Sequence, residues 1–181
     1  EGKVPTLVID GRKLTEVAAT LWYLARRYPE AGLLPQHGDI EAEARVLSWM
    51  SFIAATIHPA RRAGDERWRE VFHLAEQRLG PNEWAVERYS IADIHLFRLY
   101  WRFVTTLRPA PGSYPNLSAH HDRMMARPAV RRTLETEAAV GLSSAPQHGV
   151  GGSGFGGGGF GGGGFGGGFS SRTQRQAPGP V

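Results

Sequence analysis

The chain has 181 residues, a formal net charge of +4 and no cysteine. The absence of cysteine excludes structural disulfides, thiolate metal sites and a cysteine nucleophile within it. The length is enough for one or two small domains with real cores. The sequence has no apolar run long enough to span a membrane and does not open with a signal peptide, so we expect a cytoplasmic protein without a membrane partner.

The positive charge is spread along the chain rather than concentrated. Nearly all of it comes from arginine, two of these residues, Arg172 and Arg175, lie near the C-terminus, and acids and bases are interspersed elsewhere. A nucleic-acid-binding surface would need a concentrated basic stripe. We therefore expect solvated helix faces and no nucleic-acid partner.

The segment from Lys3 to Glu16 carries the sharpest functional signal. Its β-forming residues stand before and after Asp10-Gly11, a dipeptide typical of a two-residue hairpin turn, and Thr15-Glu16 then opens an apolar periodic stretch. The pattern predicts strand, turn, strand and helix. Pro5 stands where the first strand begins, so Val4-Pro5 is a candidate cis peptide that would turn the Val4 backbone outward to pair with an extended ligand.

Val4-Pro5-Thr6-Leu7 followed by Leu14-Thr15-Glu16 resembles the glutathione site of the glutathione S-transferase family. The resemblance implies that the Val4 backbone pairs with the cysteinyl part of glutathione and that Glu16 holds its γ-glutamyl end, where Val17 replaces the usual Ser. The residues it assigns to glutathione are Val4, Pro5, Thr15, Glu16 and Val17. The alternative is an ordinary hairpin with a turn proline.

A helix is expected from Val17 to Tyr28, where Pro29 stops it, and residues 30–39 have the composition of a linker. Asp39 is the predicted N-cap of a second helix that runs to about His58. Its apolar stripe is Val46, Met50, Ile53 and Ile57, with Leu47 and Ala54 beside them.

The run from Trp49 to His58 resembles the first helix of the helical domain in bacterial, beta-class transferases. The resemblance implies a second-substrate pocket at Ser51, Thr56 and His58. Only His58 keeps the expected residue type, and Pro59 stands where a lysine is usual. The polar half of that pocket is therefore altered.

After a loop at 61–66, a helix is expected from Arg67 to Leu79, with one apolar face: Trp68, Val71, Phe72, Ala75 and Leu79. Ser90 and Asp93 form a predicted capping box, flanked by a staple of Tyr89 and Ile94. The helix that follows, from Ile91 to about Thr105, is apolar on nearly all sides and should lie at the centre of a bundle. The Ser-Ile-Ala-Asp box is a second match to the family, with a structural role.

Two further helices are expected, from Asn116 to Arg127 and from Pro128 to about Ala138, and the resemblance extends to that point. The predicted fold class is α+β and mostly α: a β-β-α C-terminal half of a thioredoxin-like domain, an all-helical transferase bundle and a disordered tail. The predicted domains are a partial glutathione-binding domain at 1–29, the linker at 30–39, the helical domain at 40–140 and the tail at 141–181.

The tail is rich in glycine, punctuated by phenylalanine from Phe155 to Phe169. Ordering so many glycines costs more conformational entropy than the packing of this segment could offset, which favours disorder. One interpretation is that the phenylalanines mediate weak self-association. The other is that the tail is dispensable or results from a shifted reading frame.

Two weak metal cues are present, His73 with Glu76 and the run His120-His121-Asp122. The first has no third ligand at useful spacing, and the adjacent residues of the second point in different directions on a helix. Both are therefore interpreted as exposed polar groups and no metal site is predicted. The sequence also has no nucleophile elbow, no phosphate-binding loop and no carboxylate pair whose spacing indicates acid–base work.

The family resemblance implies thiol chemistry, in which glutathione is a co-substrate and no further cofactor is needed. In that family a Tyr, Ser or Cys from the first strand–helix unit activates the thiol, and this unit would lie upstream of Glu1. We therefore expect a truncated chain with no catalytic residue of its own and very weak conjugation at best. The complete form would be a homodimer that conjugates glutathione to hydrophobic electrophiles in detoxification. The alternative is a non-catalytic scaffold or binding protein with the transferase fold.

Overall fold

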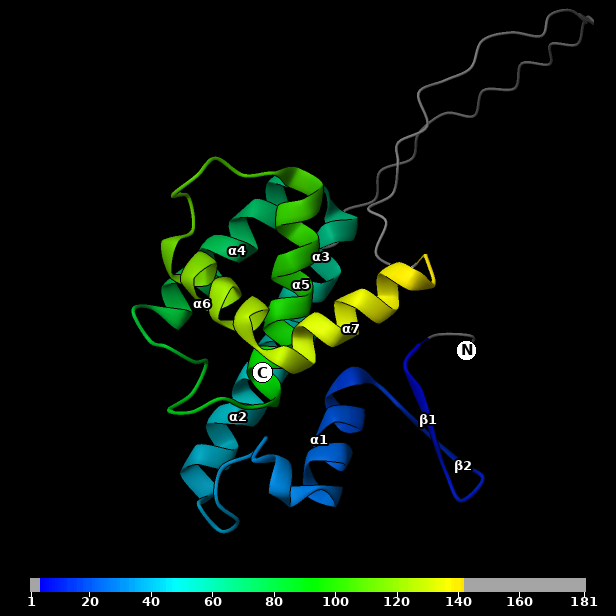
Figure 1. The fold of residues 1–181 in the computed structure, drawn as a ribbon. Helices are drawn as coiled ribbons and strands as arrows, with labels where there is room; N and C mark the ends of the chain where they lie inside the picture. Colours follow the sequence, from blue (N-terminus) through cyan, green and yellow to red (C-terminus); the bar gives the residue numbers. More distant parts are fainter. Residues whose placement is uncertain (1–3, 142–181) are drawn as a thin grey trace, which may run out of the picture. The chain divides into compact units, whose positions relative to one another are not determined.

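A computed structural model of the chain describes residues 4–141. These residues belong to one compact unit, Glu1–Gln147, which opens with a β-hairpin and continues as helices (Figure 1). The expected class, mostly helical with a small sheet, is confirmed. The expectations for the tail beyond 141 lie outside the described residues. None of the helices within 4–141 is both long and apolar enough to cross a membrane.

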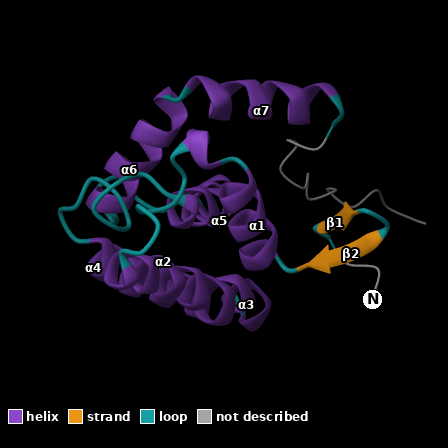
Figure 2. Cartoon of the chain, turned by 90° about the horizontal axis from the view of Figure 1, so that it is seen from below, coloured by secondary structure: helices purple, strands orange, loops and turns teal. Residues whose placement is uncertain are grey.

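The hairpin consists of β1 (Thr6–Ile9) and β2 (Arg12–Thr15), which pair antiparallel with Thr6 opposite Thr15 (Figure 2). Asp10 and Gly11 form its two-residue turn, with φ of 48° and 76°. Positive φ at both positions is what a type I′ turn requires. The predicted hairpin is thus confirmed, as is the cis peptide between Val4 and Pro5.

Helix α1 (Val17–Arg27) follows β2 and ends before Pro29, as predicted. The proline begins a short 3₁₀ turn, η1 (Pro29–Ala31), within the stretch expected to be a linker. Asp39 then caps α2 (Ile40–Phe52), because its Oδ1 accepts a hydrogen bond from the Ala42 amide at 3.1 Å.

The helical run extends two residues past its predicted end near His58, but it is not one regular α-helix. The chain continues through a π-helical segment, η2 (Ile53–Ile57), then α3 (His58–Ala60) and a 3₁₀ turn, η3 (Arg61–Ala63). A proline inside a regular α-helix lacks a donor and clashes with the carbonyl four residues earlier. Here the His58 amide donates to the Ile53 carbonyl, and Pro59 falls in the first turn of α3, where proline is tolerated.

Helix α4 (Asp65–Leu79) begins two residues earlier than predicted, so part of the expected loop at 61–66 is helical. Two acidic side chains in its first turn, Asp65 and Glu66, favour this start through the helix dipole. The remaining helices agree with the predicted ranges to within two residues: α5 (Ile91–Leu107), α6 (Pro115–Ala126) and α7 (Pro128–Ala139).

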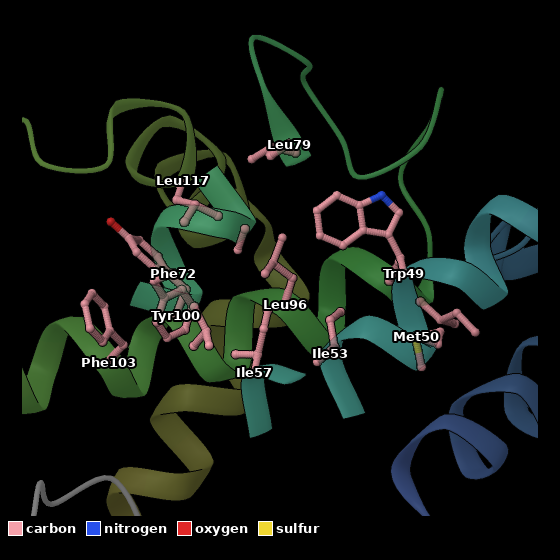
Figure 3. Close-up of a cluster of buried hydrophobic side chains, with 14 of the residues drawn as sticks. Trp49, Met50, Ile53, Ile57, Phe72, Leu79, Leu96, Tyr100, Phe103 and Leu117 are labelled. Carbon is pink, nitrogen blue, oxygen red and sulfur yellow. The ribbon is translucent and has the colours of Figure 1, made fainter. Parts of the chain in front are cut away.

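The core forms around α5, whose aromatic rings meet those of α4 (Figure 3). The rings of Phe72 and Phe103 have centroids 4.3 Å apart, and Tyr100 lies 5.6 Å from Phe72. The predicted apolar face of α4 is buried throughout. Leu47 and Ala54 were wrongly placed beside the buried stripe of α2, because the helical phase exposes both and buries Trp49 instead.

The predicted capping box at the start of α5 is confirmed and has additional partners. Asp93 accepts hydrogen bonds from the amides of Ser90 and Ala85, both at 2.8 Å, and the Ser90 hydroxyl accepts from the Ala92 amide. The Nε2 atom of His120 lies 3.0 Å from the same carboxylate. Asp93 and His120 are fully buried, so the expectation of an exposed His120 is wrong.

Glu76 was also expected to be exposed and is instead buried. Its two carboxylate oxygens accept hydrogen bonds from the amides of Asn116 and Leu117, each at 2.8 Å. These amides open α6, whose first N–H groups have no partner within the helix. Glu76 therefore caps α6 from α4, a contact between residues 40 positions apart.

Candidate functional site

A groove of about 790 Å³ lies between the hairpin and the helices. All five residues that the sequence assigns to glutathione meet in its lining. The hairpin side also contributes Lys13, and the full set there is Val4, Pro5, Thr6, Lys13, Thr15, Glu16, Val17 and Ala18. Four residues from the helices complete the lining: Ala54, His58, Arg62 and His95.

Glu16 has the most unusual backbone in the groove. Its φ is 72° and its ψ is 131°, a combination that non-glycine residues rarely adopt. The Glu16 side chain makes no capping hydrogen bond, although its carbonyl accepts the first helical bond, from the Thr20 amide. The exposed carboxylate therefore stands at the start of α1 without being engaged in capping that helix.

The π-helical segment η2, which follows α2, contributes side chains to the groove. Ile53 and Ile57 in this segment are buried in the core, while Ala54 and the adjoining His58 are exposed and line the groove. Single π turns inside α-helices are frequent at functional sites because they change which side chains share a face. The sequence signal for this segment is Pro59, which cannot continue a regular α-helix.

His95 is the one groove residue that comes from the central helix α5. Only 5% of its surface is exposed, and its Nδ1 atom has no hydrogen-bond partner among the described residues. Burial, and secondarily the neighbouring His58, lowers the pKa of His95 to about 4. At neutral pH its imidazole is therefore uncharged and able to donate one hydrogen bond and accept another.

Sequence reasoning missed His95, Arg62 and Lys13. For His95 a signal existed, because it is the one histidine in a helix that is apolar on nearly all sides. For the other two no local pattern pointed to the groove. Of the three residues predicted for a second-substrate pocket, His58 lines the groove, whereas Ser51 is exposed and Thr56 half-buried outside the lining.

A second cavity of about 350 Å³ shares His58 and Arg62 with the groove. It is otherwise formed by a mixture of arginine and apolar side chains: Ile57, Arg61, Trp68, Leu99 and Arg102. No group of three or more side chains suited to hold a metal ion occurs in the part of the chain described.

The sequence pattern of the glutathione S-transferase C-terminal domain matches residues 47–128. The structure of the bacterial beta-class glutathione S-transferase from Sphingomonas chungbukensis superimposes with a TM-score of 0.68 and 31% identity, covering 78% of this chain and 75% of that one. The chain belongs to the glutathione S-transferase family.

Two further relatives agree with this assignment. A sphingomonad glutathione S-transferase, whose structure was determined in complex with glutathione, is 30% identical with a TM-score of 0.68, covering 76% of this chain and 75% of that one. Glutathione S-transferase GstA of Escherichia coli O157:H7 is 29% identical over 156 residues, which cover 76% of this chain and 75% of that protein. These findings confirm the resemblance to bacterial transferases and the fold predicted from it.

Proposed function

We propose that the groove binds glutathione and that the complete protein conjugates glutathione, through its sulfur, to electrophilic small molecules. One observation carries this proposal: Val4, Pro5, Thr15, Glu16 and Val17, predicted from sequence alone, line a single groove together with His58. A related transferase with the same fold was determined with glutathione bound. No further cofactor is part of the proposal.

The hairpin side would hold the tripeptide. The exposed backbone of Val4 would pair with the cysteinyl unit in the way a sheet edge pairs with a peptide. The Glu16 carboxylate would accept hydrogen bonds from the γ-glutamyl ammonium, and the first amides of α1 would donate to a carboxylate. Val17 provides no hydroxyl, which removes a hydrogen bond of about 1 kcal/mol.

The reaction requires the thiol to lose its proton before it attacks. The cations of Lys13 and Arg62 in the groove would favour the thiolate over the thiol. The sulfur electron pair would then form a bond to the electrophilic carbon, and the leaving group would depart with its bonding electrons. The groove lining described contains no Tyr, Ser or Cys, the residue types that activate the thiol in this family.

We expect the activating residue, as the family resemblance implies, in sequence upstream of Glu1, and we expect the complete protein to act as a homodimer on hydrophobic electrophiles. The test is a conjugation assay with 1-chloro-2,4-dinitrobenzene, comparing this chain with the chain extended by its upstream coding sequence. Saturable turnover by the extended protein, and very weak turnover by the chain alone, are the expected results. An extended protein that neither turns over nor is retained on immobilised glutathione would instead favour a non-catalytic scaffold.

A further inference from the structure

We propose that the second cavity binds an anionic group, so that the preferred second substrate is an electrophile carrying a carboxylate. This inference rests on the proposed function, because it names the class of molecule that the transferase would conjugate.

The cavity lining is strongly basic. It contains Arg61, Arg62 and Arg102 together with His58, and no aspartate or glutamate. None of the three guanidinium groups makes a hydrogen bond or a salt bridge to another residue within 4–141. Glu137, whose negative charge acts on Arg102, forms its salt bridge with Arg98 instead, at 3.6 Å.

The like charges of the arginines that line this cavity repel one another. Arg102 is half-buried, and its burial, along with the charges of Arg98 and Arg61, lowers its pKa. A guanidinium nevertheless stays charged at neutral pH, so the repulsion cannot be relieved by deprotonation. A bound carboxylate would relieve it, and guanidinium groups match a carboxylate with two parallel hydrogen bonds.

The remaining surface of the cavity is apolar. Ile57, Trp68 and Leu99 line it, and the guanidinium of Arg61 lies 5.9 Å from the centre of the Trp68 ring. A volume of about 350 Å³ is at the lower end of the range for small-molecule sites. A small aromatic acid therefore fits both the size and the chemistry, with its ring on the apolar surface and its carboxylate among the arginines.

The cavity and the groove adjoin at His58 and Arg62, which line both. In the proposed arrangement, a molecule with its carboxylate in the cavity extends past these two residues to the glutathione sulfur in the groove. The glutathione conjugate of such a molecule would occupy both spaces at once.

The test is calorimetric titration of the full chain with three probes: glutathione, S-(4-carboxybenzyl)glutathione and its neutral isostere S-(4-carbamoylbenzyl)glutathione. We expect the carboxylate conjugate to bind about tenfold more tightly than the carboxamide. Arg62→Gln and Arg102→Gln should each reduce this ratio to about threefold or less. Arg131→Gln, an exposed position on α7 outside both cavities, is the matched control and should leave the ratio unchanged.

Circular dichroism of each variant establishes that it is folded before its ratio is used. Equal binding of the two conjugates, or a ratio that survives both Arg62→Gln and Arg102→Gln, would overturn the anion site while glutathione binding upholds the proposed function. If glutathione and both conjugates fail to bind the folded chain, the proposed function itself is contradicted, and the anion site with it.

Discussion

Asp93 and His95 stand two residues apart on the same buried helix and have opposite surroundings. Asp93 is fully buried, and its carboxylate accepts from two backbone amides and contacts His120. His95 is nearly as buried, but its Nδ1 has no partner among the described residues and its side chain lines the groove. Buried polar groups are normally paired. The burial of Asp93 is thus explained by the fold alone. The unpaired His95 nitrogen beside the groove instead indicates a place for a ligand.

The largest effect on stability is expected from substituting Asp93, whose carboxylate has hydrogen-bond partners throughout. Asp93→Ala would leave buried amides and His120 without their acceptor, and should lower the free energy of unfolding by about 4 kcal/mol. This is more than a helix cap alone contributes, because the structure adds Ala85 and His120 to the predicted box. Urea denaturation monitored by circular dichroism measures it.

Asp122→Ala is the matched control for this change, since Asp122 is an exposed aspartate on α6. It should alter the free energy of unfolding by less than about 0.5 kcal/mol. A small and equal effect of the two substitutions would show that the Asp93 network is not what holds α5, α6 and the connecting segment together.

A smaller effect on stability is expected from His95, whose Nδ1 atom is unpaired, and only at acidic pH. The pKa of His95 is about 4 in the folded chain against an ordinary value of 6.5, so the unfolded chain takes up the proton first as the pH falls. Stability from this source is complete above pH 6.5 and is lost between pH 6.5 and 4. The loss between pH 7 and pH 5 should be about 2 kcal/mol.

Replacing His95 by a side chain that cannot be protonated removes this pH-dependent contribution to stability. The difference in unfolding free energy between pH 7 and pH 5 should therefore shrink by about 2 kcal/mol in His95→Leu. It should stay as in the unmodified chain in His73→Gln, which changes an exposed histidine on α4. An equal pH dependence in all three proteins would contradict the buried neutral state of His95.

The smallest effect is expected for Ser90→Ala. Its hydroxyl accepts a hydrogen bond from the Ala92 amide and donates one to the Asp93 carboxylate, both at 3.2 Å, and a cap of this kind contributes about 1 kcal/mol. The melting temperature should fall by several degrees, clearly less than for Asp93→Ala. A fall as large as that of Asp93→Ala would mean that the serine, rather than the carboxylate, organises the start of α5.

The features that sequence predicted well depend on residues close together in the chain. Asp10-Gly11 determines the hairpin turn because only a few residue types accept positive φ at both positions. Ser90 and Asp93 are three residues apart, so their reciprocal hydrogen bonds could be read from the sequence itself. The glutathione-binding half of the groove likewise comes from one short segment, Val4 to Val17.

The features that sequence missed depend on residues brought together from far apart. Glu76 is buried because it caps a helix 40 positions away, and His120 because it reaches Asp93, 27 positions away. Neither partner can be chosen from spacing on a single helix. The basic cavity joins Arg61 and Arg62 with Arg102 across two helical segments, so its charge also became visible only in the fold.

Glutathione binding by the groove is tested most directly by calorimetric titration of three proteins: the unmodified chain, Glu16→Gln, and Glu135→Gln as an exposed control on α7. Glutathione should bind the unmodified chain saturably. Binding should weaken roughly tenfold in Glu16→Gln, which loses the charge that holds the γ-glutamyl ammonium, and stay unchanged in Glu135→Gln. Equal affinity in all three proteins, or no binding to the folded unmodified chain, would contradict the site described.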